Sequence, residues 1–162
     1  MDMVDTERYA RHISLPDVGI TGQKLIDDSR VLVVGAGGLG SPVLMYLAAA
    51  GIGHIGVVDD DVVDLSNLQR QIIHSESAIG RPKVESAKER INSINSAIKV
   101  TTWNARLSPD NAEEILCDWD IVIDGTDNIP TRYLVDDVCN MLGIPWIYLS
   151  LIHISEPTRP TP

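Results

Sequence analysis

The stretch VVGAGGLGSP, residues Val33–Pro42, decides the fold of this chain. It joins the apolar run RVLVVG, which is typical of a buried strand, to a helix-length apolar stretch that stops at Gly51 and Gly53. Glycines in such a turn let a phosphate group approach backbone N–H groups at a helix N-terminus, which carries about half a positive charge. The stretch therefore indicates a nucleotide-binding turn, and the alternative is a tight turn without a ligand. The predicted binding glycines are Gly35, Gly37, Gly38 and Gly40.

Apolar strand patterns alternate with helix patterns along the rest of the chain. Further strands are predicted at HIGVVD (54–59), IKVTTW (98–103), WDIVIDG (119–125) and IPWIY (144–148). Helices are predicted at LGSPVLMYLAAAGIG (39–53), after Pro82, at NAEEILCD (111–118) and at NIPTRYLVDDVCNMLG (128–143). Strands that are apolar on both faces and separated by helices predict a parallel sheet covered on both sides. The predicted class is α/β, a Rossmann-like doubly wound, mostly parallel sheet that is incomplete at the C-terminus.

Composition narrows the kind of protein. The chain has 162 residues, 44% of them apolar, which is enough for one domain with a core. A net charge of −10 argues against nucleic acid or an anionic membrane as the partner. We expect a cytoplasmic protein without membrane association, because the sequence has no long uncharged apolar run and no apolar signal region at its start. Cys117 and Cys139 show no zinc-site spacing, and both are expected to be buried small apolar residues.

Polar residues follow the second predicted strand. Asp59 ends that strand, where an acid can accept hydrogen bonds from ribose hydroxyls, and up to this point NAD and ATP fit equally well. Asn67, Gln69 and Arg70 follow in DDDVVDLSNLQRQ. Lys83 stands in the first turn of the next helix, where the helix dipole disfavours a cation, so a nearby anion would explain it. The alternative for Lys83 is a solvated surface lysine.

Two acids end the fourth predicted strand, in IVIDGTDN. Asp124 and Asp127 would reach the same carboxyl edge of the sheet, the crevice where doubly wound folds bind ligands. The alternative is that one of them caps the following helix. Hydride transfer does not need the cations gathered at this edge. Cleavage of a phosphoanhydride does, because Arg and Lys stabilise charge on the phosphates while a carboxylate holds magnesium.

Five segments carry a resemblance to a known family: RYARH, GAGGLGS, DDDVVDLSNLQRQ, GRPKVESA and DGTDN. They occur in the order and at roughly the spacing of the MoeB/ThiF adenylyltransferases, bacterial relatives of the ubiquitin-activating enzymes. The resemblance extends from Arg8 to Tyr148 and is greatest to the MoeB-like molybdopterin-synthase branch. It implies an enzyme that binds ATP and magnesium, adenylates the C-terminal carboxylate of a ubiquitin-like sulfur-carrier protein and releases pyrophosphate. The pathway would be molybdopterin, thiamine, cysteine or thiolated tRNA biosynthesis.

The resemblance also implies residue roles. The residues that would contact the phosphates are Gly38, Asn67, Arg70 and Lys83. Asp59 would hold the ribose and Asp127 would hold magnesium, and Asn128 completes the predicted nucleotide-binding set. Arg11 matches an arginine that reaches into the ATP site from a neighbouring subunit, which implies a homodimer. The alternative for Arg11 is a solvated charge in a flexible terminus. The predicted catalytic residues are thus Arg11, Arg70, Lys83 and Asp127.

The predicted organisation has three parts: an N-terminal arm and helix (1–29), an ATP-binding half-domain (30–148) and a tail (149–162). Leu149–Arg159 resembles the in-frame translation of a transposase adapter used in sequencing libraries, so we expect the tail to be non-native, the alternative being a natural tail. The family's second half, which holds two zinc-binding cysteine pairs, is absent from these 162 residues. We therefore expect the chain alone to be impaired as an enzyme.

Two other functions fit the same fold. One is an NAD-dependent oxidoreductase, built on the shared glycine turn. The other is a non-catalytic nucleotide-binding scaffold subunit. Partners of that kind typically lose the arginine and acid of the ATP site, whereas Arg70, Lys83 and Asp127 are all present here.

Overall fold

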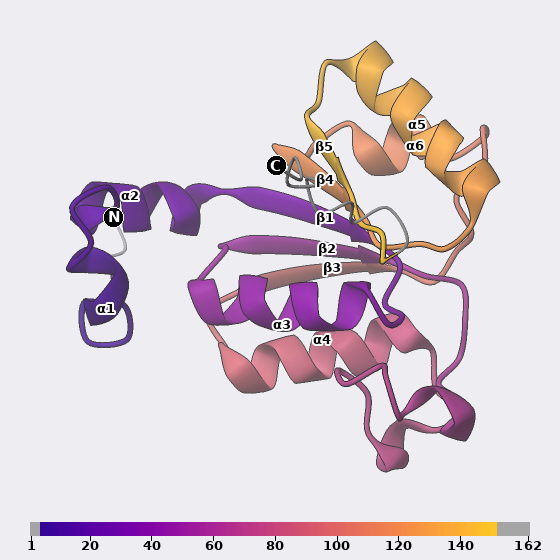
Figure 1. Cartoon of the computed structure of the whole chain (residues 1–162), viewed down its shortest axis with the longest axis horizontal. Coiled ribbons are helices and arrows are strands. Elements are labelled where there is room, and N and C mark those ends of the chain that lie inside the picture. Colours follow the sequence, from indigo (N-terminus) through magenta and orange to yellow (C-terminus); the bar gives the residue numbers. More distant parts are fainter. Residues whose placement is uncertain (1–3, 152–162) are drawn as a thin grey trace, which may run out of the picture.

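A five-stranded parallel sheet forms the centre of the molecule (Figure 1). The structure is a computed structural model, and it describes residues 4–151. The strands are β1 (Arg30–Val34), β2 (His54–Val58), β3 (Lys99–Trp103), β4 (Ile121–Asp124) and β5 (Trp146–Tyr148). Their order in the sheet is β3-β2-β1-β4-β5, and every pair is parallel. The chain therefore runs outward from β1 in both directions, as in doubly wound folds, so the predicted class is confirmed.

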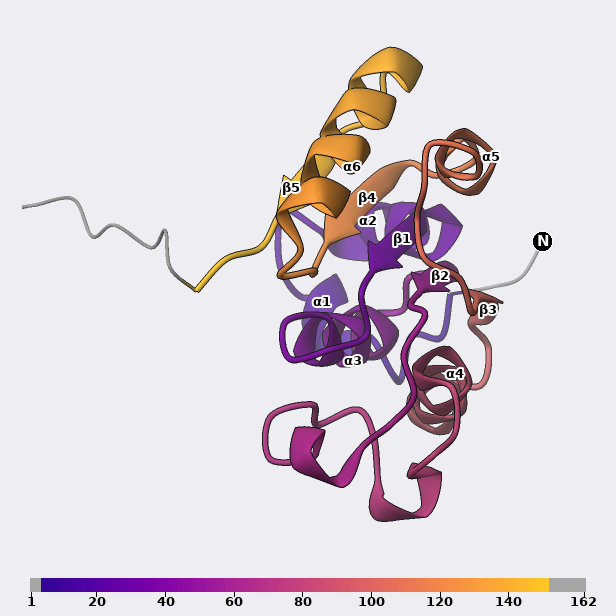
Figure 2. The same ribbon diagram turned by 90° about the vertical axis from the view of Figure 1, so that its right-hand side faces the viewer.

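Helices cover both faces of this sheet (Figure 2). The helices are α1 (Ala10–Ile13), α2 (Gly19–Asp28), α3 (Gly40–Ala50), α4 (Lys83–Ile94), α5 (Ala112–Leu116) and α6 (Ile129–Leu142), with two 3-10 turns at Leu65–Asn67 and Glu76–Ala78. Helices α3 and α4 pack on one face, and α5 and α6 on the other. Within residues 4–151, no helix combines the length and apolar character needed to cross a membrane.

Alternation along the central strand explains the two layers. Val31 and Val33 of β1 point into the core beneath α3 and α4, while Leu32 and Val34 point into the core beneath α5 and α6. All four side chains are buried, which accounts for the uninterrupted apolar run in the sequence. The border strands β3 and β5 are less buried than the central ones. Strand β5 pairs with β4 on one side, and within residues 4–151 no strand pairs with its other side.

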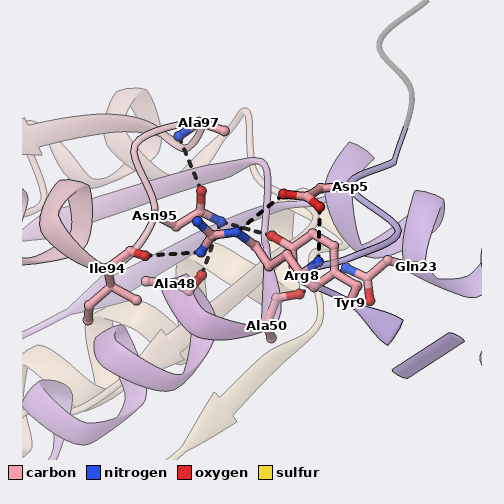
Figure 3. A network of polar contacts seen from close by, with 9 residues as sticks. All are labelled: Asp5, Arg8, Tyr9, Gln23, Ala48, Ala50, Ile94, Asn95 and Ala97. Carbon is pink, nitrogen blue, oxygen red and sulfur yellow. Dashed lines mark hydrogen bonds and ion pairs between the residues drawn. The ribbon is translucent and has the colours of Figure 1, made fainter. Parts of the chain in front are cut away.

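The N-terminal segment is packed against the ends of helices α3 and α4, at the amino end of the sheet (Figure 3). Buried Asn95 donates to the Tyr9 hydroxyl over 2.9 Å, and Arg8 donates to the Ile94 carbonyl over 3.1 Å. Gln23 of α2, fully buried, donates to the Ala50 carbonyl at the end of α3 over 3.0 Å. The segment that carries Arg11 is therefore anchored to the rest of the fold, while the Arg11 side chain itself is exposed.

The cysteines differ from one another. Cys139 of α6 is buried as expected, and burial raises the pKa of its thiol to about 11. Cys117 is exposed, which corrects the expectation that it would be buried. It follows directly on the short helix α5, whose buried face is formed by Ala112, Ile115 and Leu116. Of the proposed tail, residues 152–162 lie outside the described residues, and Leu149 continues the β4 pairing by donating to the Asp124 carbonyl.

Candidate functional site

A cleft of about 690 Å³ opens at the carboxyl ends of the strands. The strand order reverses between β1 and β4, and the crevice beside this point is where doubly wound folds bind ligands. The predicted site residues that line it are Gly35, Gly37, Gly38, Asp59, Asn67, Arg70, Lys83, Asp127 and Asn128. Gly40 and Arg11 are the two predicted residues that do not line it.

The glycine turn is shaped by close backbone approaches. Gly35 has φ +94°, a left-handed conformation that favours glycine, and its N–H donates to the Val58 carbonyl. A Cβ at Gly40 would overlap the Gly35 carbonyl, so Gly40 serves the tight packing of the turn. A Cβ at Gly38 would meet only the Arg70 side chain, at 3.7 Å. Gly38 therefore leaves open the space that a phosphate would need.

Asp59 fixes this turn from the neighbouring strand. One carboxylate oxygen accepts from the Ala36 N–H over 2.7 Å, and the other accepts from the Asp61 N–H over 2.8 Å. Each carboxylate oxygen keeps a further lone pair, so Asp59 can still accept a hydroxyl proton. The acid thus orders the turn and lies where a ribose would be expected.

Lys83 is buried, with only 4% of its surface exposed, so the alternative of a solvated lysine is wrong. Its Nζ donates to the Asp61 carboxylate over 2.8 Å, and its backbone N–H donates to the Asp61 carbonyl over 2.9 Å. Asp61 is the anion that offsets the dipole at the start of α4. The sequence analysis did not assign Asp61 this role, although it stands in the quoted run DDDVVDLSNLQRQ.

His74 is a buried residue next to the glycine turn, outside the lining of the cleft, that the sequence analysis missed. Its buried ring bridges two partners. Nε2 is 2.8 Å from the Ala36 carbonyl oxygen, and Nδ1 is 2.9 Å from the Ser86 hydroxyl. Burial is the largest cause and lowers the pKa of the ring. The hydrogen bond with Ala36 raises that pKa in part, the charge of Lys83 lowers it further, and Asp59 raises it slightly. A single histidine in a polar loop carries no periodic signal that would reveal such a bridge.

The fourth strand contributes a buried acid. Asp124 is fully buried, and one oxygen accepts from the N–H and the hydroxyl of Thr126 over 2.9 and 2.7 Å. Its other oxygen faces Arg132 Nε at 3.8 Å, and the Arg132 guanidinium stacks 3.5 Å above the Tyr148 ring. Arg132 and Tyr148 both line the cleft. Neither was predicted, because Arg132 stands inside a helix pattern and Tyr148 inside a strand pattern.

The cap of α6 corrects one alternative. Asn128, and neither Asp124 nor Asp127, is the N-cap, since its side-chain oxygen accepts from the Thr131 N–H over 3.2 Å. Asp127 is left exposed at the rim of the cleft. Asp127 and Asn128 thus both lie at the cleft. Within residues 4–151 the Asp127 carboxylate makes no hydrogen bond or ion pair, whereas Asn128 holds the start of the helix.

Four buried polar atoms make no hydrogen bond within residues 4–151: Ser41 Oγ, Gln71 Oε1, Asp124 Oδ2 and Arg132 Nε. Gln71 and Arg132 line the cleft, and Ser41 and Asp124 lie on the elements that border it. Buried polar groups are normally paired, so their concentration at one place marks a site that a polar ligand can complete. Of the four atoms, Asp124 Oδ2 and Arg132 Nε face one another at 3.8 Å, so Ser41 Oγ and Gln71 Oε1 are the two that a ligand could complete.

Carboxylates at the same edge could hold a cation. One oxygen each from Asp59, Asp60 and Asp61 lie within 4.8 Å of one another. Lys83 already neutralises Asp61 there. Asp127, the predicted magnesium ligand, is outside this group and on the other side of the glycine turn.

Arg11 lies far from this cleft in its own chain. It belongs to α1, at the amino end of the sheet, whereas the cleft is at the carboxyl end (Figure 1). Its side chain is exposed. Arg11 therefore does not reach the cleft of its own chain.

Comparison with known proteins assigns the family. The model of the ThiF family matches residues 9–155, which is most of the chain. The chain belongs to the ThiF family. It is 51% identical over 147 residues to a Mycobacterium tuberculosis protein named "Probable adenylyltransferase/sulfurtransferase MoeZ", covering 91% of this chain and 38% of that protein. It is 47% identical to the "SAMP-activating enzyme E1" of Haloferax volcanii, covering 91% of this chain and 55% of that one.

Solved structures show the same fold. The Escherichia coli tRNA N6-threonylcarbamoyladenosine dehydratase TcdA in complex with ATP superposes with a TM-score of 0.85 at 30% identity, covering 91% of this chain and 61% of that one. The chain therefore spans between about two fifths and three fifths of the length of these relatives. The part of these relatives that matches the chain has the same fold.

Proposed function

We propose that the cleft binds ATP and that the protein is an adenylyltransferase acting on the C-terminal carboxylate of a ubiquitin-like sulfur-carrier protein. The observation that carries the proposal is the meeting of Arg70, Lys83 and the open face of Gly38 at one edge of the sheet. Cations beside a glycine turn suit a triphosphate better than they suit hydride transfer. The names of the relatives, which include adenylyltransferases and an ATP-bound structure, support the same choice.

The residues of the chain would act by binding and orienting the reactants. In the proposed reaction a carrier carboxylate oxygen forms a bond to the α-phosphorus, and the bond from that phosphorus to the bridging oxygen breaks. The electron pair leaves with pyrophosphate, and the product is an acyl-adenylate. Arg70 and Lys83 would offset the charge that moves onto the phosphates, and Asp59 would fix the ribose. No side chain of the protein needs to act as a nucleophile in this step.

Magnesium fits the proposal through the carboxylates at the edge. Asp127 is exposed, and its carboxylate has no partner in the part of the chain that the structure describes. Hard oxygen ligands of this kind suit magnesium bound together with phosphates. Bound there, magnesium would supply neutralisation of phosphate charge. Asp127 would hold it from the loop that follows β4.

A homodimer completes the proposed site. Arg11 is exposed on a helix that is anchored to α3 and α4 and lies at the opposite end of the sheet from its own cleft. We propose that Arg11 contacts the nucleotide bound by a second copy.

We also propose a molybdopterin-type carrier and a cytoplasmic location. The high identity to adenylyltransferase/sulfurtransferase relatives supports this type of carrier.

The test of the proposed reaction is carrier-dependent exchange of pyrophosphate into ATP, measured on the longest product that the gene encodes. Arg70→Ala and Asp127→Ala should each lower the exchange rate by about 10²- to 10³-fold, the range for loss of one group that stabilises transition-state charge. Arg90→Ala removes an arginine of α4 outside the cleft and serves as the matched control, with a near-normal rate. Near-normal exchange in the Arg70 and Asp127 variants would contradict the assignment.

A further inference from the structure

Polar contacts around the glycine turn form a closed ring. Starting from Ala36, its N–H donates to Asp59, which accepts from the Asp61 N–H, and the Asp61 carboxylate pairs with Lys83. Lys83 begins α4, and Ser86 stands one turn further along that helix, on the same side. His74 closes the ring, because its ring lies against both the Ser86 hydroxyl and the Ala36 carbonyl.

We infer that His74 is a positioning residue for nucleotide binding: it locks the Ala36 peptide of the glycine turn to helix α4, which carries Lys83. The inference rests on the proposed function, since it concerns the same cleft. His74 itself does not line the cleft, so it acts through the turn and through Lys83.

The chemistry of the two partners fixes the state of the ring. The Ala36 carbonyl can only accept a hydrogen bond, so Nε2 must carry the proton and donate to it. In the neutral ring Nδ1 then has a lone pair and accepts from the Ser86 hydroxyl. Burial and the charge of Lys83 both favour this neutral ring. The structure thus requires the Nε2–H tautomer.

The place of Ala36 explains why this bond matters for a ligand. Ala36 is fully buried between Gly35 and Gly37, and its N–H and its carbonyl are both held by side chains from other segments. The Ala36 N–H belongs to the peptide between Gly35 and Ala36, and the Ala36 carbonyl belongs to the peptide between Ala36 and Gly37. Because a peptide is planar, the bond that holds the Ala36 carbonyl also fixes the direction of the Gly37 N–H before a ligand arrives. Preorganised donors bind an anion without the cost of ordering them.

The test combines a spectrum with a set of variants of the whole chain. Correlation of ring protons with ring nitrogens in ¹⁵N-labelled protein should show the Nε2–H tautomer for His74 without any nucleotide. In ATP titrations with magnesium, His74→Phe should weaken binding about tenfold, a change of about 1.4 kcal/mol. His74→Gln places an amide N–H near the position of Nε2 and should restore affinity to within about threefold of wild type.

His54→Gln is the matched control. His54 is also hydrogen-bonded, to Thr101 over 2.8 Å, and burial lowers the pKa of its ring as well, but it stands at the amino end of β2. Its variant should bind ATP like wild type. A role in stability alone would lower the melting temperature of the His74 variants and leave the affinity of the folded protein unchanged, which would overturn the inference.

The outcomes separate the two proposals. If wild-type protein binds ATP and His74→Phe binds it equally well, the positioning role is wrong while the proposed function stands. If wild-type protein does not bind ATP, the proposed function fails and the inference fails with it. Should His74→Phe not fold, the tautomer and His74→Gln decide: an Nδ1–H ring, or loss of affinity in His74→Gln equal to that of a His74→Ala variant, would overturn the inference.

Discussion

Two polar networks lie at opposite ends of the sheet, and they differ in how completely they are paired. At the amino end, Asn95 uses its amide to bond with Tyr9, Ala48 and Ala97. At the carboxyl end, the buried Gln71 keeps an oxygen that makes no hydrogen bond within the described chain. Both networks tie together segments that are distant in sequence.

The difference separates a structural network from a binding site. A buried polar group that lacks a partner costs free energy, so a folded protein keeps such groups mainly where a ligand or water completes them. The fully paired network around Asn95 should contribute to folding, and the partly paired cleft should contribute to binding. Substitutions around Asn95 should therefore lower the free energy of unfolding and leave ATP affinity unchanged, whereas substitutions in the cleft should mainly weaken ATP binding.

The largest effect is expected inside the glycine turn, where two neighbouring glycines should behave differently. Gly40→Ala puts a Cβ onto the Gly35 carbonyl and should lower the free energy of unfolding by roughly 3 kcal/mol or more. Gly38→Ala has space for its methyl and an ordinary backbone conformation, so it should fold normally but weaken ATP binding about tenfold. Urea unfolding and ATP titration check both variants, and equal behaviour of the two would contradict the geometry.

Asn95→Ala should give the signature of the structural network. It removes partners of the Tyr9 hydroxyl and the Ala97 N–H, so the free energy of unfolding should fall by about 1–3 kcal/mol. The ATP affinity of the folded protein should not change. Asn140→Ala, which removes an exposed hydrogen bond to Asp136, is the control and should cost less than about 0.5 kcal/mol. A loss of ATP affinity in Asn95→Ala would remove the distinction between the two networks.

Lys83→Met should give the signature of the binding site. The variant removes a buried ammonium, while its partner Asp61 has 68% of its side chain exposed and is not left buried. The free energy of unfolding should thus stay the same or rise, whereas ATP binding should weaken about tenfold, or 1.4 kcal/mol. Lys24→Met, which breaks an exposed pair with Asp28, is expected to change neither quantity. A large loss of stability in Lys83→Met would place Lys83 with the structural residues instead.

The smallest effect is a dependence of stability on pH. Because burial lowers the pKa of His74 below its usual value of 6.5, the unfolded chain binds the proton more tightly than the folded one. Stability is therefore full above pH 6.5 and is lost as the pH falls through the lowered pKa, by at most about 1.4 kcal/mol per pH unit. His74→Gln should show a shallower decline between pH 7 and 5. The same slope in both proteins would contradict the burial of a neutral ring.

The sequence predicts the strands and helices well because each has its own local pattern. The run Arg30–Gly35, the glycine stop at Gly51 and the stop at Gly143 all appear in the structure where the pattern places them, both stops with left-handed glycines. The predicted cleft residues also meet, because carboxyl ends of neighbouring parallel strands share one edge.

Contacts between distant segments are what the pattern does not contain. The pairing of His74 with Ala36, and of Arg132 with Asp124, depends on how helices and loops pack, so neither was predicted. Cys117 was expected to be buried from its residue type, yet burial depends on its neighbours in the fold, and it is exposed.

The central claim is that the cleft, and not the amino-end network, binds ATP. The most direct measurement is a series of amide spectra of the ¹⁵N-labelled chain during titration with ATP and magnesium. The account predicts that the signals of Gly37, Gly38 and Asp127 shift while those of Tyr9 and Asn95 do not. Shifts with NADH but not with ATP, or shifts centred on Asn95, would contradict it.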